Sequence, residues 1–182
     1  MLWLCLSLIG VAAAISLPMT WLVRQVGVRL SALDSPGVAG QIKQARRPVP
    51  NTGGIAIFFA VAMPMLGGLA LIWFAEPWIV QAMPAVKEYA AGVRQESRGA
   101  VILLASLAWL HVLGVIDDRK PLGPFVKLLF MSLPAFAIPL LTGTRLFEFL
   151  TPHVGGPWLS TILPALWILV VTNALNFMDN MD

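Results

Sequence analysis

The chain alternates long apolar runs with shorter polar segments, and five of the runs are long enough to cross a lipid bilayer. A helix needs about 20 apolar residues to span the hydrocarbon core. The pattern therefore predicts an all-α, polytopic membrane protein. The expected spans cover approximately residues 2–23, 55–74, 99–116, 125–141 and 159–177.

Several of these runs contain prolines, which would break helices in a soluble protein. In a membrane, neighbouring helices can satisfy the carbonyl groups that proline leaves without a donor. We therefore expect the prolines to mark kinks and not helix ends. They are Pro18, Pro64, Pro134, Pro139 and Pro164.

The composition supports a membrane protein and excludes several other classes. Of the 182 residues, 58% are hydrophobic and 12% are charged, which lies outside the range of soluble domains and of disordered chains. The single cysteine, Cys5, excludes an intrachain disulfide and argues against a thiolate metal site. A net charge of +3 is too small to indicate nucleic-acid binding. The expected surroundings are the lipid bilayer.

The distribution of lysine and arginine predicts the orientation of the spans. Residues 24–54 carry five basic residues against one acid, whereas residues 75–98 balance three basic residues with three acids. Because basic residues favour the cytoplasmic side, we expect the first loop to be cytoplasmic and the N-terminus to be outside. Alternating from there places eight basic residues inside and four outside.

Two adjacent acids, Asp117 and Asp118, directly follow the third apolar run. Successive side chains on a helix point about 100° apart, so the two carboxylates would not share one face. Carboxylates ~4 Å apart repel by roughly 4 kcal/mol at an effective dielectric of 20, which favours a cation beside them. The alternative is that they are interfacial charges at a helix end, paired with Arg119 and Lys120.

The fifth run ends in a second polar cluster with helical spacing, so its members form one stripe on an apolar helix. One such asparagine could simply join two helices by a hydrogen bond, but amides followed by acids are harder to explain as packing. Oxygen ligands without histidine or cysteine suit Mg²⁺. The cluster consists of Asn173, Asn176, Asp179, Asn180 and Asp182.

Basic residues near these clusters are candidates for binding phosphate. In the first loop, Lys43 and Arg47 precede a Pro-x-Pro-x-x-Gly-Gly segment that ends at Gly54, where backbone could approach a ligand closely. The alternative for this loop is contact with anionic lipid headgroups. Lys127, about one turn into the fourth span, could hold a phosphate or extend to the membrane interface.

Taken in order, these motifs resemble those of the polyprenyl-phosphate N-acetylhexosamine-1-phosphate transferase superfamily, the MraY-like and WecA-like enzymes of glycosyltransferase family 4. The resemblance covers the whole chain. The matching elements are Asp-x-Pro at 34–36, Lys43 with the Pro-x-Pro-x-x-Gly-Gly segment, Gly114-x-x-Asp-Asp followed by Lys127, and the Asn-x-x-Asn-x-x-Asp-x-x-Asp series at 173–182.

This resemblance implies transfer of a sugar-1-phosphate from a UDP-N-acetylhexosamine to undecaprenyl phosphate, with release of UMP and a requirement for Mg²⁺. It also implies a multi-pass enzyme of the bacterial inner membrane with a cytoplasmic active site, and it leaves a homodimer open. We expect residues 1–182 to be the N-terminal half of one multi-span transferase domain and to be inactive alone.

The resemblance also implies roles for individual residues. Asp117 and Asp118 are the expected catalytic residues. The expected metal ligands are Asp118, Asp179 and Asp182. The expected substrate-binding residues are Lys43, Arg47, Lys127, Asn173 and Asn176.

The chain departs from the family pattern at three positions, and two other functions compete with this one. Ala45 stands where many relatives have His, Met131 where they have Gln, and Asn180 where they have Gly. An intramembrane prenyltransferase also uses acidic motifs with Mg²⁺, but usually spaces them as Asp-x-x-x-Asp. A multi-span transporter would be expected to hold its acids near the bilayer midplane, whereas these acids lie at the ends of spans.

Overall fold

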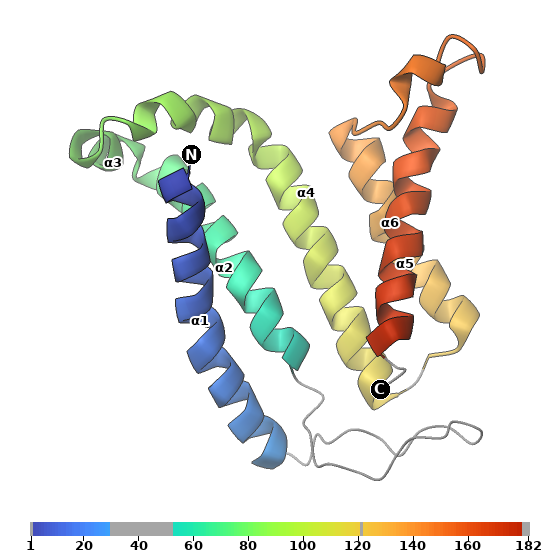
Figure 1. Cartoon of the computed structure of the whole chain (residues 1–182), viewed down its shortest axis with the longest axis horizontal. Helices are drawn as coiled ribbons and strands as arrows, with labels where there is room; N and C mark the ends of the chain where they lie inside the picture. The colour runs from blue at the N-terminus through green and yellow to red at the C-terminus, as the bar shows by residue number, and fades with distance from the viewer. Residues whose placement is uncertain (1, 30–52, 121, 180–182) are drawn as a thin grey trace. The chain divides into compact units, whose positions relative to one another are not determined.

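The computed structural model describes residues 2–29, 53–120 and 122–179, and every element in these ranges is helical (Figure 1). The all-α prediction is confirmed for these residues. Among the predicted site residues, Lys43, Arg47 and Asp182 lie outside the described ranges. The elements are α1 (Leu2–Arg29), α2 (Gly53–Phe74), α3 (Glu76–Ala82), α4 (Val86–Arg119), α5 (Pro124–Thr142), the 3-10 helix η1 (Glu148–Leu150) and α6 (Trp158–Asp179).

Five of the described helices are long and apolar enough to cross a membrane, which confirms the predicted number of spans. The third differs from its prediction, because α4 begins at Val86 and not near residue 99. Residues 86–98 are polar but rich in Ala, Glu, Lys and Arg, which favour helix. A hydropathy pattern indicates only the apolar part of a helix, which lies in lipid, so it does not predict the polar residues 86–98 as helix. Residues 76–82, also read as part of a connection, form α3.

The helices continue through their prolines, as expected for membrane helices. In α6, Pro164 has no N–H to donate to the carbonyl of Ser160, four residues earlier. That carbonyl instead accepts the backbone N–H of Leu146 at 2.9 Å, from the segment that follows α5. The proline thus provides an acceptor that ties the connecting segment to α6.

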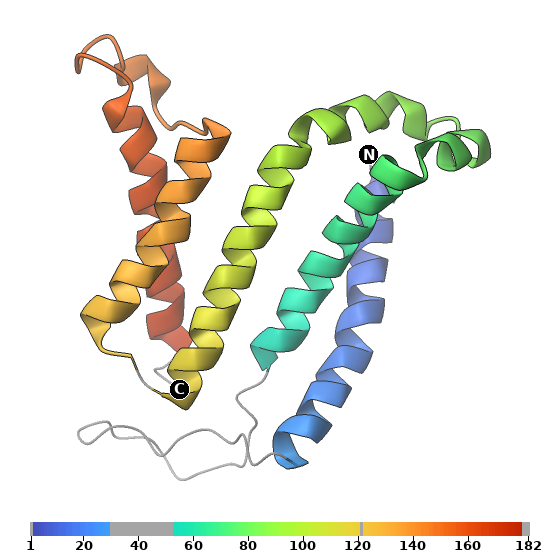
Figure 2. The same ribbon diagram turned by 180° about the vertical axis from the view of Figure 1, so that it is seen from behind.

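The described residues divide into two compact units, and the boundary between them falls within α4, between Ala100 and Val101. In the first unit α1 packs against α2 (Figures 1 and 2). The buried positions of α2 include Ala56 and Ala60, one turn apart, and Ala62. Small side chains let helix backbones approach closely, and the resulting van der Waals contact is one of the forces that hold helices together in lipid.

Arg94 of α4 holds the turn between α2 and α4 in this first unit. Its guanidinium forms an ion pair with Glu76 at the start of α3 and donates to the carbonyl of Ile72 at 3.4 Å. The same group lies 5.5 Å from the centre of the Trp73 ring. One arginine therefore contacts the end of α2 and the beginning of α3.

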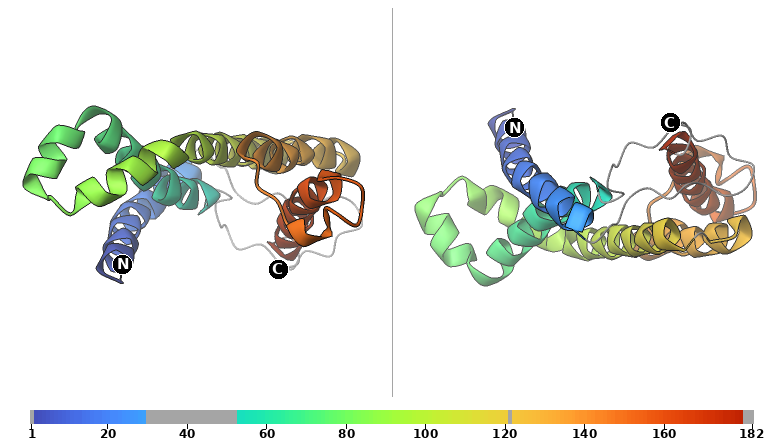
Figure 3. Two further views of the ribbon diagram at one scale, coloured as in Figure 1. Left: turned by 90° about the horizontal axis from the view of Figure 1, so that it is seen from above. Right: turned by 90° about the horizontal axis from the view of Figure 1, so that it is seen from below.

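In the second unit α5 packs against α6, and Figure 3 shows the two helices side by side. The buried residues of α5 are spaced three to four apart or adjacent, so they form one stripe: Met131, Pro134, Ala135 and Pro139. From α6, Ser160 and Ala165 are buried. This antiparallel pair brings the beginning of α5 to the end of α6, where the polar clusters lie.

Candidate functional site

Lys127 joins the two polar clusters that are far apart in the sequence. Its ammonium donates to Asp117 Oδ2 at 2.5 Å and to Asn176 Oδ1 at 3.0 Å. The three side chains come from the end of α4, the first turn of α5 and the last turns of α6, all within the second compact unit. The structure therefore brings together a carboxylate, an ammonium and an amide at one end of three helices.

Asp117 uses both of its carboxylate oxygens. Oδ2 accepts from Lys127, and Oδ1 accepts the backbone N–H of Leu122 at 2.8 Å. Asp117 lies in the last turn of α4, where the helix dipole has its negative end and disfavours a carboxylate. The ammonium and the N–H group offset this cost, so the side chain is held in one position.

Lys127 is in the complementary situation at the start of α5. The first turn of a helix is the positive end of its dipole, which disfavours a cation and favours an anion. The Lys127 side chain is only 17% exposed, and the Asp117 side chain 19%. Each charge therefore lies at the helix end that disfavours it, and their mutual attraction compensates. Local conflicts of this kind are typical of functional sites.

Asp118 differs from its neighbour in exposure. Its residue is exposed, whereas Asp117 is half-buried. This agrees with the expectation that adjacent helical side chains do not share a face. The alternative expectation is that the two acids pair with Arg119 and Lys120. For Asp117, the structure shows an ion pair with Lys127 instead.

The asparagines of α6 lie on the half-buried side of the helix but make different contacts. Asn176 accepts a hydrogen bond from Lys127, whereas Asn173 donates its amide N–H to the carbonyl of Leu169 in its own helix at 2.9 Å. Asp179 is the last residue of α6, and its backbone alone is described. Of the predicted α6 ligands, the structure thus brings Asn176 into the site.

The oxygen atoms at this end of the unit have the chemistry that Mg²⁺ prefers, namely carboxylates and an amide carbonyl. Within the side chains that the structure describes, no group of three His, Cys, Asp or Glu residues comes together. The expected ligand Asp118 is exposed beside Asp117, the side chain of Asp179 is not described, and Asp182 lies outside the described ranges. The metal site stays a prediction.

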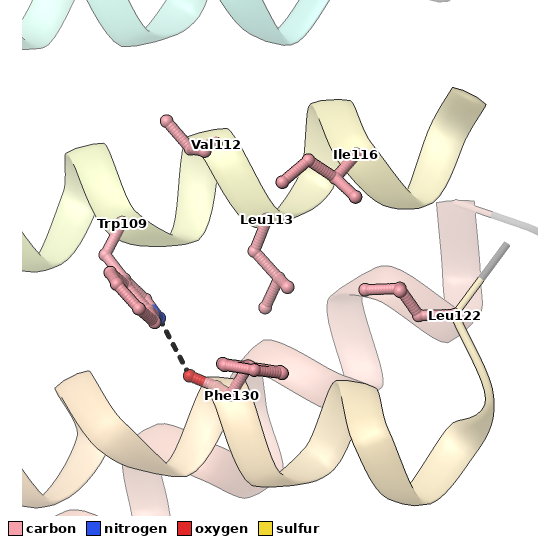
Figure 4. Close-up of a pocket in the computed structure, with 6 residues that line it drawn as sticks. All are labelled: Trp109, Val112, Leu113, Ile116, Leu122 and Phe130. Carbon is pink, nitrogen blue, oxygen red and sulfur yellow. Dashed lines mark hydrogen bonds between the residues drawn. The ribbon is translucent and has the colours of Figure 1, made fainter. Parts of the chain in front are cut away.

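An apolar pocket of about 260 Å³ lies between α4 and α5 (Figure 4) and shares one residue, Leu122, with the surroundings of the ion pair. It is lined by residues of the second half of α4, of the segment that follows α4, and of α5: Trp109, Val112, Leu113, Ile116, Leu122 and Phe130. Leu122 belongs to both features, because its side chain lines the pocket and its N–H binds Asp117. Leu122 therefore links the pocket to the charged site.

Trp109 forms one wall of this pocket and also binds α5. Its indole N–H donates to the carbonyl of Phe130 at 2.9 Å, and the two rings lie 6.1 Å apart between centroids (Figure 4). Trp109 is not among the site residues that the sequence predicts. The available signal was Pro134, four residues after Phe130, which leaves that carbonyl without a helical donor.

Comparison with known proteins matches residues 100–182 to the family described as "Glycosyl transferase family 4". This range coincides with the second compact unit, which contains the site. The chain is also 28% identical over 167 residues to a Bacillus subtilis (strain 168) protein named "Probable undecaprenyl-phosphate N-acetylglucosaminyl 1-phosphate transferase". The alignment covers 90% of this chain but 39% of the relative, so the chain spans about two fifths of that protein's length. No solved structure matches at comparable significance.

Proposed function

We propose that this protein transfers a hexosamine 1-phosphate to undecaprenyl phosphate at a membrane surface, because its residues 100–182 match glycosyl transferase family 4. The family match and the name of the Bacillus subtilis relative support the lipid acceptor and the phosphosugar group. The single structural observation that carries the proposal is the contact of Lys127 with both Asp117 and Asn176.

We further propose that the donor is a UDP-N-acetylhexosamine and that UMP is released. In this reaction an oxygen of the lipid phosphate attacks the phosphorus attached to the sugar, and the bond from that phosphorus to UMP breaks. Two anions must approach one another, so the site has to neutralise negative charge. Lys127 is the described cation closest to Asp117 and is held in place by it.

Lys127 is suited to bind a phosphate oxygen. A lysine ammonium has three N–H donors, and the contacts with Asp117 and Asn176 use two of them. The third can be offered to phosphate. An anion there would also lie at the positive end of α5, which favours it. Asp117 then orients the ammonium and positions the lipid phosphate or accepts its proton.

Mg²⁺ is proposed as the cofactor, held by Asp118, Asp179 and Asp182, directly or through water. When bound, it would supply positive charge that stabilises the transferred phosphoryl group and the departing UMP. The exposed carboxylate of Asp118 next to the ion-paired Asp117 suits such a site. Lys43 and Arg47 are proposed as further phosphate contacts, and Asn173 as a substrate contact on the same side of α6 as Asn176.

The apolar pocket beside the ion pair fits a substrate whose phosphate carries an apolar chain. The phosphate of such a substrate would bind the ammonium of Lys127, and its apolar chain would lie against the apolar residues of the pocket. Neither competing function receives comparable support. A prenyltransferase is not favoured by the family match. Asp117, Asp118 and Asp179 lie at helix ends and not at mid-span, where a transporter would need its acids.

The proposal is tested by measuring UMP release from UDP-N-acetylglucosamine and undecaprenyl phosphate with the protein at its full natural length. We expect activity with Mg²⁺, loss of activity in excess EDTA, and recovery when Mg²⁺ is restored. Asp117→Asn and Asp179→Asn should each lower the rate at least 100-fold. Glu96→Gln, at an exposed acid in the first unit, is the control and should keep the wild-type rate. Near-normal UMP release by Asp117→Asn would contradict the proposed site.

A further inference from the structure

Pro134 leaves an unusual acceptor at the α4–α5 contact. In a helix the carbonyl of residue 130 normally accepts the N–H of residue 134, but proline has none. In a bilayer, a carbonyl without a donor cannot turn to water, and leaving it unsatisfied is costly. The indole N–H of Trp109 supplies this bond from another helix.

The Trp109–Phe130 contact and the Asp117–Lys127 ion pair lie at different levels along α4 and α5. Trp109 precedes Asp117 by eight residues, which is about 12 Å along a helix, and Phe130 follows Lys127 by one turn. α4 and α5 are therefore joined at two separate levels, by Trp109 to Phe130 and by Asp117 to Lys127. One contact alone would let the helices pivot, whereas two fix their relative direction.

We propose that Trp109 is a positioning residue for the Asp117–Lys127 pair, an inference that rests on the role proposed above for that pair. The hydrogen bond to the carbonyl freed by Pro134 holds α4 against α5, and this keeps the ammonium at the distance from the carboxylate that phosphate binding requires. Misplacing a catalytic group by about 1 Å can cost on the order of 100-fold in rate, so a tether of this kind affects the rate without touching substrate.

Two variants separate positioning from a purely structural role. Trp109→Phe removes the N–H but keeps an aromatic ring. Adding Pro134→Ala gives the Phe130 carbonyl a donor within α5, so the double variant satisfies the carbonyl but leaves α4 untethered. Pro134→Ala alone keeps the tether, because a carbonyl oxygen can accept two hydrogen bonds. Trp167→Phe, at a largely exposed tryptophan of α6, is the matched control.

In full-length protein we expect Trp109→Phe to lower both Tm and kcat, with kcat falling roughly tenfold to 100-fold. The double variant should recover Tm but not kcat. Pro134→Ala and Trp167→Phe should each keep kcat within about twofold of wild type. If kcat in the double variant recovers together with Tm, Trp109 merely satisfies a carbonyl and the inference is wrong. Wild-type kcat in Trp109→Phe would also overturn it.

A second measurement does not depend on catalysis. Spin labels at Leu103→Cys in α4 and Leu140→Cys in α5, both exposed positions of the second unit, report the separation of the two helices. The background is full-length protein in which Cys5 and every further native cysteine are replaced by serine. The distance distribution should broaden in Trp109→Phe and in the double variant but not in Trp167→Phe. Unchanged distributions would refute the tether. If wild-type protein releases no UMP while the distributions broaden, the proposed function fails and the tether stands.

Discussion

Trp109 donates its indole N–H to the backbone carbonyl of Phe130. This carbonyl has no donor within α5, because the residue four positions later is Pro134. The proline and the tryptophan are thus two parts of one contact, although they lie 25 residues apart in different helices. The proline supplies an acceptor that an ordinary helix would keep for itself. The tryptophan uses this acceptor to join α4 to α5.

The same chemistry recurs at the far end of the second unit. Pro164 frees the carbonyl of Ser160, and the backbone N–H of Leu146 occupies it. Both contacts satisfy a backbone acceptor that could not be hydrated in lipid. In this protein, prolines within spans therefore provide sites for tertiary hydrogen bonds.

Lys127→Met should abolish UMP release and lower stability. The substitution keeps the length of the side chain but leaves the Asp117 carboxylate at the negative end of α4 without its ammonium partner. We expect a loss of roughly 1.5–3 kcal/mol in stability, the usual range for a hydrogen bond to a charged group, together with at least a 100-fold fall in rate. Thermal unfolding and UMP release measure the two effects.

Lys120→Met is the control, because Lys120 is an exposed cation that directly follows the C-terminal end of α4, where Asp117 lies. It should change neither quantity by much. Equal losses in both variants would show that total charge matters there and that the individual contacts of Lys127 do not.

Cysteine labelling should reveal opposite sides of the membrane for the two ends of α5. In a background in which Cys5 and every further native cysteine are replaced by serine, Lys120→Cys and Glu148→Cys each place a single thiol at an exposed position beyond one end of α5. The lysine and arginine distribution predicts that the thiol at position 120 is cytoplasmic. In intact cells a membrane-impermeant maleimide should react with the thiol at 148 and not with the thiol at 120. The reverse pattern would invert the proposed topology.

Gly143→Ala should lower stability without affecting catalysis. Gly143 ends α5 with φ of +73°, and its N–H donates to the carbonyl of Pro139 at 3.0 Å. A Cβ there would meet no atom within 4 Å, so the cost is backbone strain alone, about 1–2 kcal/mol. Gly92→Ala, inside α4 and equally uncrowded, should instead raise stability by up to about 1 kcal/mol. Chemical denaturation in detergent checks the opposite signs.

Arg94→Met should destabilise the first unit while the rate of UMP release stays within about twofold of wild type. Arg94 pairs with Glu76, binds the Ile72 carbonyl and lies over the Trp73 ring, but its side chain is 45% exposed, so each contact is weak. We expect a total loss of about 1–2 kcal/mol. Glu76→Gln, which removes the ion pair alone, should cost less than about 1 kcal/mol. A loss from Glu76→Gln as large as from Arg94→Met would assign the whole effect to the ion pair.

The amino-acid sequence by itself determined the class of fold and the number of spans, because the length of an apolar run is a direct consequence of bilayer thickness. It also determined that polar groups collect at the ends of the third and fifth spans. The sequence did not predict the turns of α4 that precede residue 99, because hydropathy indicates which part of a helix lies in lipid and not where the helix begins.

The tertiary structure decided which residues in those clusters touch. Arg119 is nearer to Asp117 in sequence than Lys127, but two residues along a helix point about 200° apart, so the partner comes from the next helix. Likewise Asn173 and Asn176 lie on one side of α6, yet only the latter reaches Lys127, because the first turn of α5 packs beside the last turns of α6. Contacts of this kind depend on how helices pack, and helical spacing within one segment does not encode them.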